Sequence, residues 1–337
     1  DKTPNIIDKI NYDMYSNHIL NFQDYPFHVN DLAFVFKDKP LDVKSHQREG
    51  AAFLYSRGRG YLAYEVGSGK TMTSILAVEK SIQGKKCKRP FICAPKNVCK
   101  NFTTVQSGQK EGNEYGMLFP KRKVHYLGNL GATIKIPKIK DGEVSVISHE
   151  ALANITYKPA TLARIEAYLQ DQIIKDGGGK RHTEVAALRI QELFTAKVAT
   201  GQVYAEDLGI DHLTIDEAHN FKNLFSITSK DFQSMGGTTA DRSARAYILA
   251  LYVMLNNNNQ NIFLLSGTPF NNQPIEIYNA LSFLAQREMQ DMGVANLYDF
   301  ASQFAETSFE WTIDKSMNLV KKQVTVGFKN ATALRQL

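Results

Sequence analysis

The chain has 337 residues, of which 43% are hydrophobic and 22% are charged, a balance that suits one large or two small folded domains and argues against disorder. A net charge of +6 permits nucleic acid as a partner without requiring it. Cys87, Cys93 and Cys99 form no C-x-x-C pair, so neither a disulfide framework nor a zinc site is expected. The N-terminus lacks an apolar signal segment, and no apolar run is long enough to span a bilayer, so no membrane partner is expected. Because the first residue is not Met, we expect a processed product or a piece of a longer polypeptide.

Residues 1–40 are rich in aromatic residues without a clear period, and we expect them to form an N-terminal extension. From residue 41 onward, short apolar runs alternate with helical patterns such as 71–83 and 244–255. Continuous apolar runs are typical of strands in a parallel sheet that is covered on both faces, and the helices supply the crossovers. The predicted fold class is therefore α/β, with a doubly wound, mainly parallel sheet. The expected strands are 60–65, 90–94, 123–127, 144–148, 212–216 and 262–266.

Two segments interrupt or follow this alternation. Residues 159–200 contain two helical patterns around the glycine-rich KDGGGKRH, which predicts a helical insertion over about 155–205. The segment 285–337 is predicted to be a mostly helical extension. Within it, SFEWTIDKSMNLVKKQ is compatible with a hairpin or a loop.

The stretch LAYEVGSGKT, at 62–71, carries the strongest chemical signal. An apolar strand enters a glycine loop, and Lys70 with Thr71 opens a helix, which is the setting of a phosphate-binding loop. Gly67, Ser68 and Gly69 would turn backbone N–H groups toward a phosphate, and Lys70 would reach the β- and γ-phosphates. The consensus glycine six residues before the lysine is Tyr64 here, so a glycine-rich turn with an exposed lysine stays open as the alternative for this stretch alone.

Two further stretches end strands with polar residues. HLTIDEAH places Asp216 and Glu217 at a strand end, where one carboxylate would bind Mg²⁺ and the other would orient or deprotonate a water. LLSGTPFNN, at 264–272, ends its strand with Ser266 and Thr268. Alone, the first is also compatible with a solvated acidic turn, and the second with an ordinary strand exit. Together with the phosphate loop, in this order, they make coincidence a poor explanation.

These stretches and their order resemble superfamily 2 helicases, and within them the Swi/Snf-type translocases on double-stranded DNA. LDVKSHQREGAAFL (41–54), FICAPKNVCKNF (91–102) and VISHEAL (146–152) are similar to the motifs that flank the phosphate loop in that family. The resemblance implies a first RecA-like, ATP-binding P-loop domain over 41–284. It is closer still to the helicase part of large phage and conjugative-element proteins, which often carry an adenine-specific DNA methyltransferase; these residues contain no methyltransferase signature.

The resemblance also implies roles for single residues. Lys70, Asp216, Glu217 and His219 would be catalytic. Thr71 and Asp216 would hold Mg²⁺, and Gln47 would read the adenine of ATP. The positions expected to contact DNA or to couple it to the nucleotide are Lys96, Asn97, Ser148, Ser266 and Thr268.

A second RecA-like domain normally completes such a motor with arginine fingers from a Q-x-x-G-R-x-x-R-like motif. After the SGTP stretch the chain has only Arg287 and Arg335, and neither lies in such a motif. We therefore expect 285–337 to lead toward a second domain elsewhere in the same polypeptide, and the isolated chain to hydrolyse ATP weakly.

The predicted function is that of an ATP-dependent DNA translocase or helicase lobe, which hydrolyses Mg-ATP and binds double-stranded DNA without sequence preference. One alternative is a phage-encoded virion cargo or scaffold-associated protein that binds nucleotide without productive motor activity, and another is an RNA-directed helicase. The expected location is the cytoplasm of a bacterial host, with packaging in a phage virion as the alternative.

Overall fold

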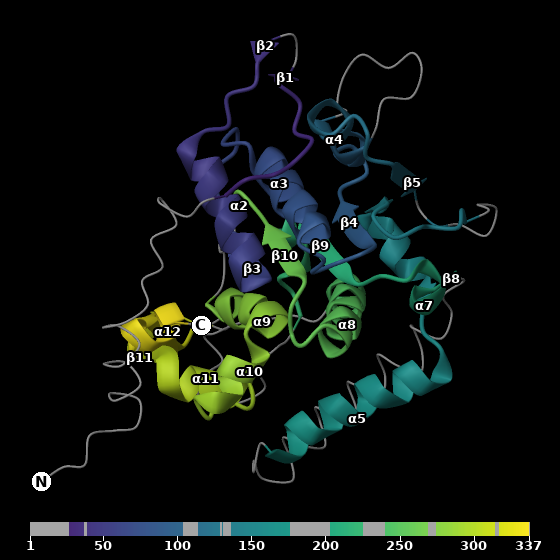
Figure 1. Ribbon diagram of the computed structural model, residues 1–337. Coiled ribbons are helices and arrows are strands. Elements are labelled where there is room, and N and C mark those ends of the chain that lie inside the picture. Colours follow the sequence, from purple (N-terminus) through teal and green to yellow (C-terminus); the bar gives the residue numbers. More distant parts are fainter. Residues whose placement is uncertain are drawn as a thin grey trace, which may run out of the picture.

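The computed structural model describes residues 27–36, 39–103, 114–128, 130, 136–175, 203–224, 240–268, 274–313 and 317–336. Its centre is a parallel sheet of six strands in the order β3-β10-β9-β4-β6-β5 (Figure 1). The α/β fold class and the parallel sheet are thereby confirmed. All six expected strands exist with nearly the predicted bounds: β3 (Arg59–Leu62), β4 (Pro90–Ala94), β5 (Val124–Gly128), β6 (Val144–Ser148), β9 (His212–Asp216) and β10 (Ile262–Leu265).

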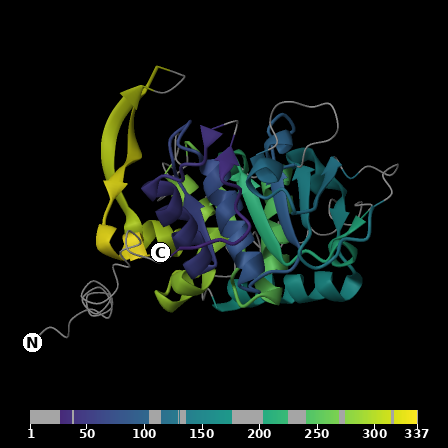
Figure 2. The same ribbon diagram turned by 45° about the horizontal axis from the view of Figure 1, so that its top comes forward.

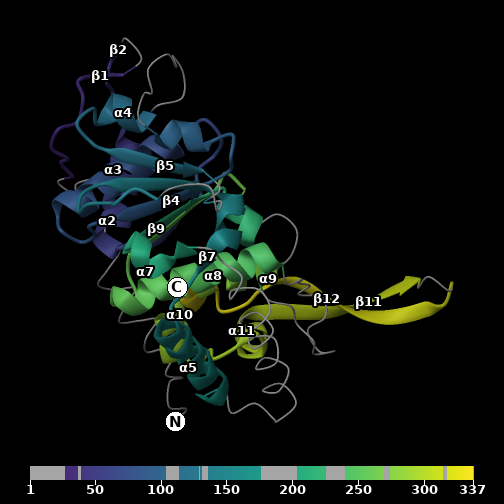
Figure 3. The same ribbon diagram turned by 90° about the vertical axis from the view of Figure 1, so that its right-hand side faces the viewer.

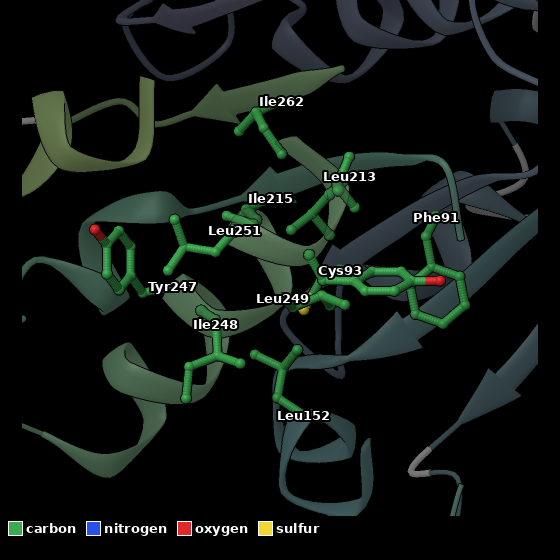
Figure 4. Packing of buried hydrophobic residues seen from close by; sticks show 14 of the residues in the cluster. Phe91, Cys93, Leu152, Leu213, Ile215, Tyr247, Ile248, Leu249, Leu251 and Ile262 are labelled. Carbon is green, nitrogen blue, oxygen red and sulfur yellow. The ribbon is translucent and has the colours of Figure 1, made fainter. Parts of the chain in front are cut away.

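Helices cover both faces of the sheet, as a doubly wound fold requires. On one face lie α2 (Ser45–Arg57) and α3 (Lys70–Gln83), and on the other lie α8 (Asp241–Asn256) and α9 (Ile275–Leu284). Successive residues of a strand point to opposite faces. In β10, Ile262 and Leu264 accordingly join the core under α8, whereas Phe263 and Leu265 join the core under α2 and α3. Figure 4 shows part of the α8 core, where Tyr247, Ile248 and Leu251 lie near Leu213 and Ile215 of β9.

Short elements connect these layers. They are β1 (Val35–Phe36), β2 (Lys39–Pro40), α4 (Glu114–Leu118), α7 (Ala205–Leu208) and the 3-10 helices η2 (Cys99–Phe102), η3 (His149–Asn154) and η5 (Ala218–Phe221). Strands β1 and β2 pair antiparallel in the region predicted as an N-terminal extension. Within the described residues, no helix combines the length and apolar character needed to cross a membrane.

The predicted insertion leaves and rejoins the domain through one short strand pair. Strand β7 (Ile155–Thr156) runs parallel to β8 (Val203–Tyr204), so the ends of the insertion lie side by side. Helix α5 (Pro159–Lys175) confirms the first of the two expected helices and extends along the lower side of the domain in Figure 1. The second expected helix and the glycine-rich segment lie outside the described residues.

The prediction of a mostly helical C-terminal extension is wrong for its central part. After α10 (Gln286–Asp291) and α11 (Leu297–Phe304), the chain forms an antiparallel hairpin of β11 (Ala305–Ile313) and β12 (Leu319–Phe328), followed by α12 (Ala331–Gln336). The alternation of polar and apolar residues from Ser308 to Ile313 has a period of two, which suits a strand and not a helix. Of the two structures expected for this stretch, a hairpin or a loop, the hairpin forms.

Candidate nucleotide-binding site

The candidate site is built where three neighbouring parallel strands end. Leu265 of β10 pairs with Leu62 of β3 on one side and with Asp216 of β9 on the other. Parallel strands lie about 4.8 Å apart, so the three loops that follow them begin within about 10 Å of one another. In open α/β sheets this carboxyl edge is where ligands bind. The sheet thus brings together the phosphate-loop, DEAH and SGTP stretches.

The phosphate loop has the backbone of an anion-binding turn. Gly67 and Gly69 both have φ of +85°, a left-handed conformation that side chains with a Cβ rarely adopt. Helix α3 begins directly after them at Lys70, so its first N–H groups face the loop. A Cβ on Gly67 would meet no atom within 4 Å, whereas one on Gly69 would lie 2.2 Å from Gln47 Nε2. The loop is open to a ligand near Gly67 and closed by α2 near Gly69.

Lys70 lies between the phosphate loop and the SGTP turn. Its Nζ donates hydrogen bonds to the carbonyl oxygens of Tyr64, at 3.1 Å, and Glu65, at 3.2 Å. A Cβ on Gly267 would lie 3.4 Å from the same Nζ, so the two loops are in near contact at this ammonium group. Phosphate oxygens are stronger acceptors than backbone carbonyls and would compete for these protons.

Helix α2 braces the loop from the outside. Gln47 is buried; its Nε2 donates to Ser68 O at 3.2 Å, and its Oε1 accepts from Lys44 N–H at 3.1 Å. His46 Nε2 is also 3.0 Å from Ser68 O, and Tyr64 Oη donates to His46 O at 2.6 Å. The amide of Gln47 has a second N–H, so its predicted contact with adenine stays a prediction beside a role in positioning the loop.

Asp216 is the buried acid of the DEAH stretch. It ends β9 with 4% of its surface exposed. Burial, followed by the adjacent Glu217 carboxylate, raises the pKa of Asp216 to about 7, and the nearby Lys70 ammonium opposes this shift. Glu217 has a left-handed backbone, with φ of 51° and ψ of 49°, and is half-buried. A buried carboxylate beside the phosphate loop, only partly stabilised by Lys70, is a group that a bound cation would stabilise further.

The residues present fit a magnesium ion that arrives with nucleotide. Mg²⁺ takes oxygen ligands and is usually held by one or two carboxylates together with substrate phosphates and water. Asp216 supplies the carboxylate, and Thr71, half-buried in the first turn of α3, supplies a hydroxyl near the loop. Within the described ranges, no group of three or more His, Cys, Asp or Glu residues forms a metal cage of its own.

A hydrogen-bond chain joins the DEAH and SGTP stretches. His219 Nδ1 lies 2.9 Å from Ser266 Oγ and 3.2 Å from Glu217 Oε2. Ser266 is fully buried, and its Oγ also accepts from Thr268 N–H at 3.1 Å. Tyr61, on the phosphate-loop strand β3, is hydrogen-bonded to the same hydroxyl. The predicted coupling residues His219, Ser266 and Thr268 are therefore in one network with the predicted base.

Three contacts hold the segments on either side of the DEAH acids. His149 Nε2 lies 2.9 Å from Asp216 O, and burial lowers the pKa of His149 to about 4, so the ring is neutral near pH 7 and donates its Nε2–H to the carbonyl. On the other side, Lys222 Nζ pairs with the buried Glu276 of α9 at 2.9 Å, and Asn279 donates to Lys222 O. These contacts hold η5 between η3 and α9.

The predicted DNA contacts do not all face solvent. Lys96 and Asn97 are exposed in the turn after β4, at the same sheet edge as the nucleotide site. Ser148 is 0% exposed, and this contradicts its expected role as a direct phosphate donor. The N–H of Glu150 and the Ser148 hydroxyl instead hydrogen-bond the Glu150 carboxylate and lower its pKa. Ser148 is followed at once by η3, and its position there turns it into the core.

Sequence reasoning missed three residues that shape the site. His149 lies inside the quoted VISHEAL stretch, His46 stands next to Gln47, and Tyr61 belongs to a strand that was read only as apolar. A buried strand that carries a tyrosine signals a hydrogen-bond partner, since a buried phenol rarely lacks one. Nothing in the sequence identified the partner as Ser266, about 200 residues away.

The chain is similar to known proteins over much of its length. A family model described as "Probable helicase domain" matches residues 131–337. "Defense against restriction protein B" of Escherichia phage P1 is 25% identical over 349 residues, an alignment that spans 89% of this chain and 15% of that protein. Among solved structures, the Sulfolobus solfataricus SWI2/SNF2 ATPase core in complex with dsDNA is 15% identical, with a TM-score of 0.41. The match covers 78% of this chain and 39% of the Sulfolobus chain. Since the family model covers more than half of the residues, the chain belongs to the helicase-domain family.

Proposed function

We propose that this chain is the first lobe of an ATP-driven translocase on double-stranded DNA. The observation that carries the proposal is the meeting of three loops at one sheet edge: Lys70 lies against Gly267, and Asp216 lies within electrostatic reach of Lys70. A phosphate loop, a buried carboxylate and a sensing hydroxyl in this arrangement suit hydrolysis of a nucleoside triphosphate.

The roles of the residues follow from their chemistry. Lys70 and the N–H groups of the loop bind the phosphates, and Thr71 and Asp216 hold Mg²⁺. When bound, the ion would neutralise negative charge on the transferred phosphoryl group. Glu217 orients the attacking water and accepts its proton. Gln47 binds adenine from the helix that braces the loop.

Coupling to DNA uses the network between the strands. Loss of the terminal phosphate changes the contacts of Lys70 with the SGTP turn, and Ser266 transmits that change to His219 and Thr268. Lys96 and Asn97 lie at the same edge and bind backbone phosphates, which positions DNA without reading its sequence. Lys222 and Asn223 after D-E-A-H, and the segment that follows SGTP, resemble the DNA-translocase branch and favour double-stranded DNA over RNA as the track.

We further propose that the chain works inside a longer protein of a phage or mobile element, which supplies the second RecA-like lobe. The phage P1 relative is named for defence against restriction, and the chain spans 15% of its length. The alternative, a nucleotide-binding cargo protein without productive turnover, predicts the same ATP site but no hydrolysis stimulated by DNA.

Binding of ATP is tested with a fluorescent ATP analogue and Mg²⁺. We expect Lys70→Ala to weaken binding at least about tenfold, because one charge-assisted phosphate contact is lost. Lys121→Ala is the matched control, since this lysine is 85% exposed and pairs with the exposed Asp31 at 3.3 Å. Equal affinity in wild type and Lys70→Ala would refute the site.

Hydrolysis is tested with Glu217→Gln in the complete protein. The amide still hydrogen-bonds water but accepts no proton, so binding should persist while turnover falls by about 10²–10⁴. DNA-stimulated turnover in wild type separates the motor from the cargo alternative. Near-normal turnover in Glu217→Gln would exclude the proposed base.

A further inference from the structure

The β11–β12 hairpin carries exposed aromatic side chains on one of its faces. Figures 2 and 3 show the hairpin projecting beyond the sheet and its helices. Its base is fixed in a small core that contains Phe304, Ala305 and Phe328. Toward the tip, Phe309 is 60% exposed, and Trp311 and Ile313 are each 65% exposed. Large side chains at this exposure on a projecting element indicate a binding surface.

The register places these residues on one face. Phe309, Trp311 and Ile313 alternate along β11 and pair with Gln323, Lys321 and Leu319 of β12. Lys321 Nζ lies 4.8 Å from the centroid of the Phe309 ring, in cation–π contact. Over the described strand residues, this face carries no Asp or Glu, because Glu306 and Glu310 fall on the opposite face. The face therefore combines two accessible rings with one positive charge.

We propose that this face binds single-stranded nucleic acid by stacking bases on Phe309 and Trp311, with Lys321 on the phosphate backbone. Stacking on aromatic side chains next to a basic residue is how proteins bind single strands without sequence preference. A duplex buries its base faces and offers only its ends, so this surface suits unpaired nucleotides. An apolar protein partner would leave the Lys321 ammonium buried without an anion, whereas a phosphate satisfies it.

This inference goes beyond the proposed translocase function. A translocase lobe tracks duplex backbone with Lys96 and Asn97, whereas the hairpin would hold an unpaired strand. The hairpin residues touch neither the phosphate loop nor the DEAH acids, so their failure to bind DNA would leave ATP binding by the chain unchanged, and the two proposals fail separately.

The chain offers a direct probe, because Trp311 is its only tryptophan. We would titrate the 337-residue chain with a dT15 single strand and follow tryptophan emission, and measure affinity for all variants by anisotropy of a labelled strand. Stacking should quench Trp311, and Phe309→Ala should weaken binding at least about fivefold. Lys321→Ala should lower the slope of log K against log salt by about 0.7. Glu310→Ala, the neighbour on the opposite face, is the matched control and should bind as wild type does.

Two competitor ligands sharpen the result. A fully abasic strand keeps the phosphates and removes the bases, so it should bind more weakly and leave Trp311 unquenched. A blunt 15-base-pair duplex should also leave it unquenched. Three results would overturn the proposal: no quenching of Trp311 by dT15, equal affinity for dT15 and the abasic strand, or equal losses of affinity in Phe309→Ala and Glu310→Ala. Any of them would assign the face to another part of the polypeptide or to a protein partner.

Discussion

Replacement of Asp216 by Asn should stabilise the metal-free fold above pH 7, although it removes a residue that we assign to magnesium. The Asp216 carboxylate is 4% exposed, and burial is the main reason that its pKa rises to about 7. Asn has nearly the same shape and carries no charge. The variant therefore avoids the cost of holding an anion in the core without its cation.

The magnitude follows from proton linkage. Between the ordinary pKa of 3.8 and the folded value of about 7, the folded chain binds a proton that the unfolded chain has released. The free energy of unfolding therefore falls as pH rises, by about 1.4 kcal/mol per unit, and the full penalty of about 4 kcal/mol is present above pH 7. Between pH 5 and pH 8.5 the advantage of Asp216→Asn over wild type should grow by about 3 kcal/mol.

Urea unfolding with EDTA, at pH 5 and at pH 8.5, measures this difference. Asp42→Asn, at an exposed position before α2, is the control and should follow wild type at both values. Addition of Mg-ATP at pH 8.5 should stabilise wild type more than Asp216→Asn. If Asp216→Asn is no more stable than wild type at pH 8.5 without metal, the carboxylate is better solvated or better paired than its burial indicates.

The remaining predictions concern the loop and the DEAH segment. Gly67→Ala should cost about 1–2 kcal/mol of unfolding free energy, because φ is +85° at this position. Gly69→Ala, where φ is also +85°, should cost about 1 kcal/mol more, because its Cβ displaces Gln47 from the loop. Equal losses of the two variants in urea unfolding would show that Gln47 does not brace the loop. Glu276→Ala should cost about 3 kcal/mol by leaving Lys222 without its buried partner, and adding Lys222→Met should recover much of the loss. A double variant less stable than Glu276→Ala would show that the lysine is better paired elsewhere.

Much of the fold was predictable because its signals are local. Strands β4, β6 and β9 have the bounds expected from their apolar runs, since a strand buried on both faces is rich in apolar residues. The phosphate loop was recognisable for the same reason: glycines, a lysine and a helix start lie within ten residues. Parallel strands then place the ends of β3, β9 and β10 at one edge of the sheet, and the strand order makes the three neighbours.

The rest depends on contacts between distant segments. Ser148 has the same local pattern as an exposed strand-end hydroxyl, and only the turn into η3 buries it. The Lys222–Glu276 pair joins residues 54 positions apart, and a charge at either position alone predicts a solvated surface. In the C-terminal extension, the prediction of a mostly helical 285–337 holds for the short helices α10 and α11. The residues between the two strands, 314–318, include no glycine that would have marked a hairpin turn from sequence.

The protons of the Ser266 network can be assigned from its donors and acceptors. A serine hydroxyl has one hydrogen to donate and two lone pairs. If Ser266 donated to His219 Nδ1, that nitrogen would present a lone pair to Glu217 Oε2 at 3.2 Å, and two acceptors would face each other. If Nδ1 carries the hydrogen, it donates to both Ser266 Oγ and Glu217 Oε2, and Ser266 accepts from Thr268 N–H and donates to Tyr61 Oη. Only the second assignment satisfies every contact, so the SGTP turn holds the histidine in the form that orients the Glu217 carboxylate.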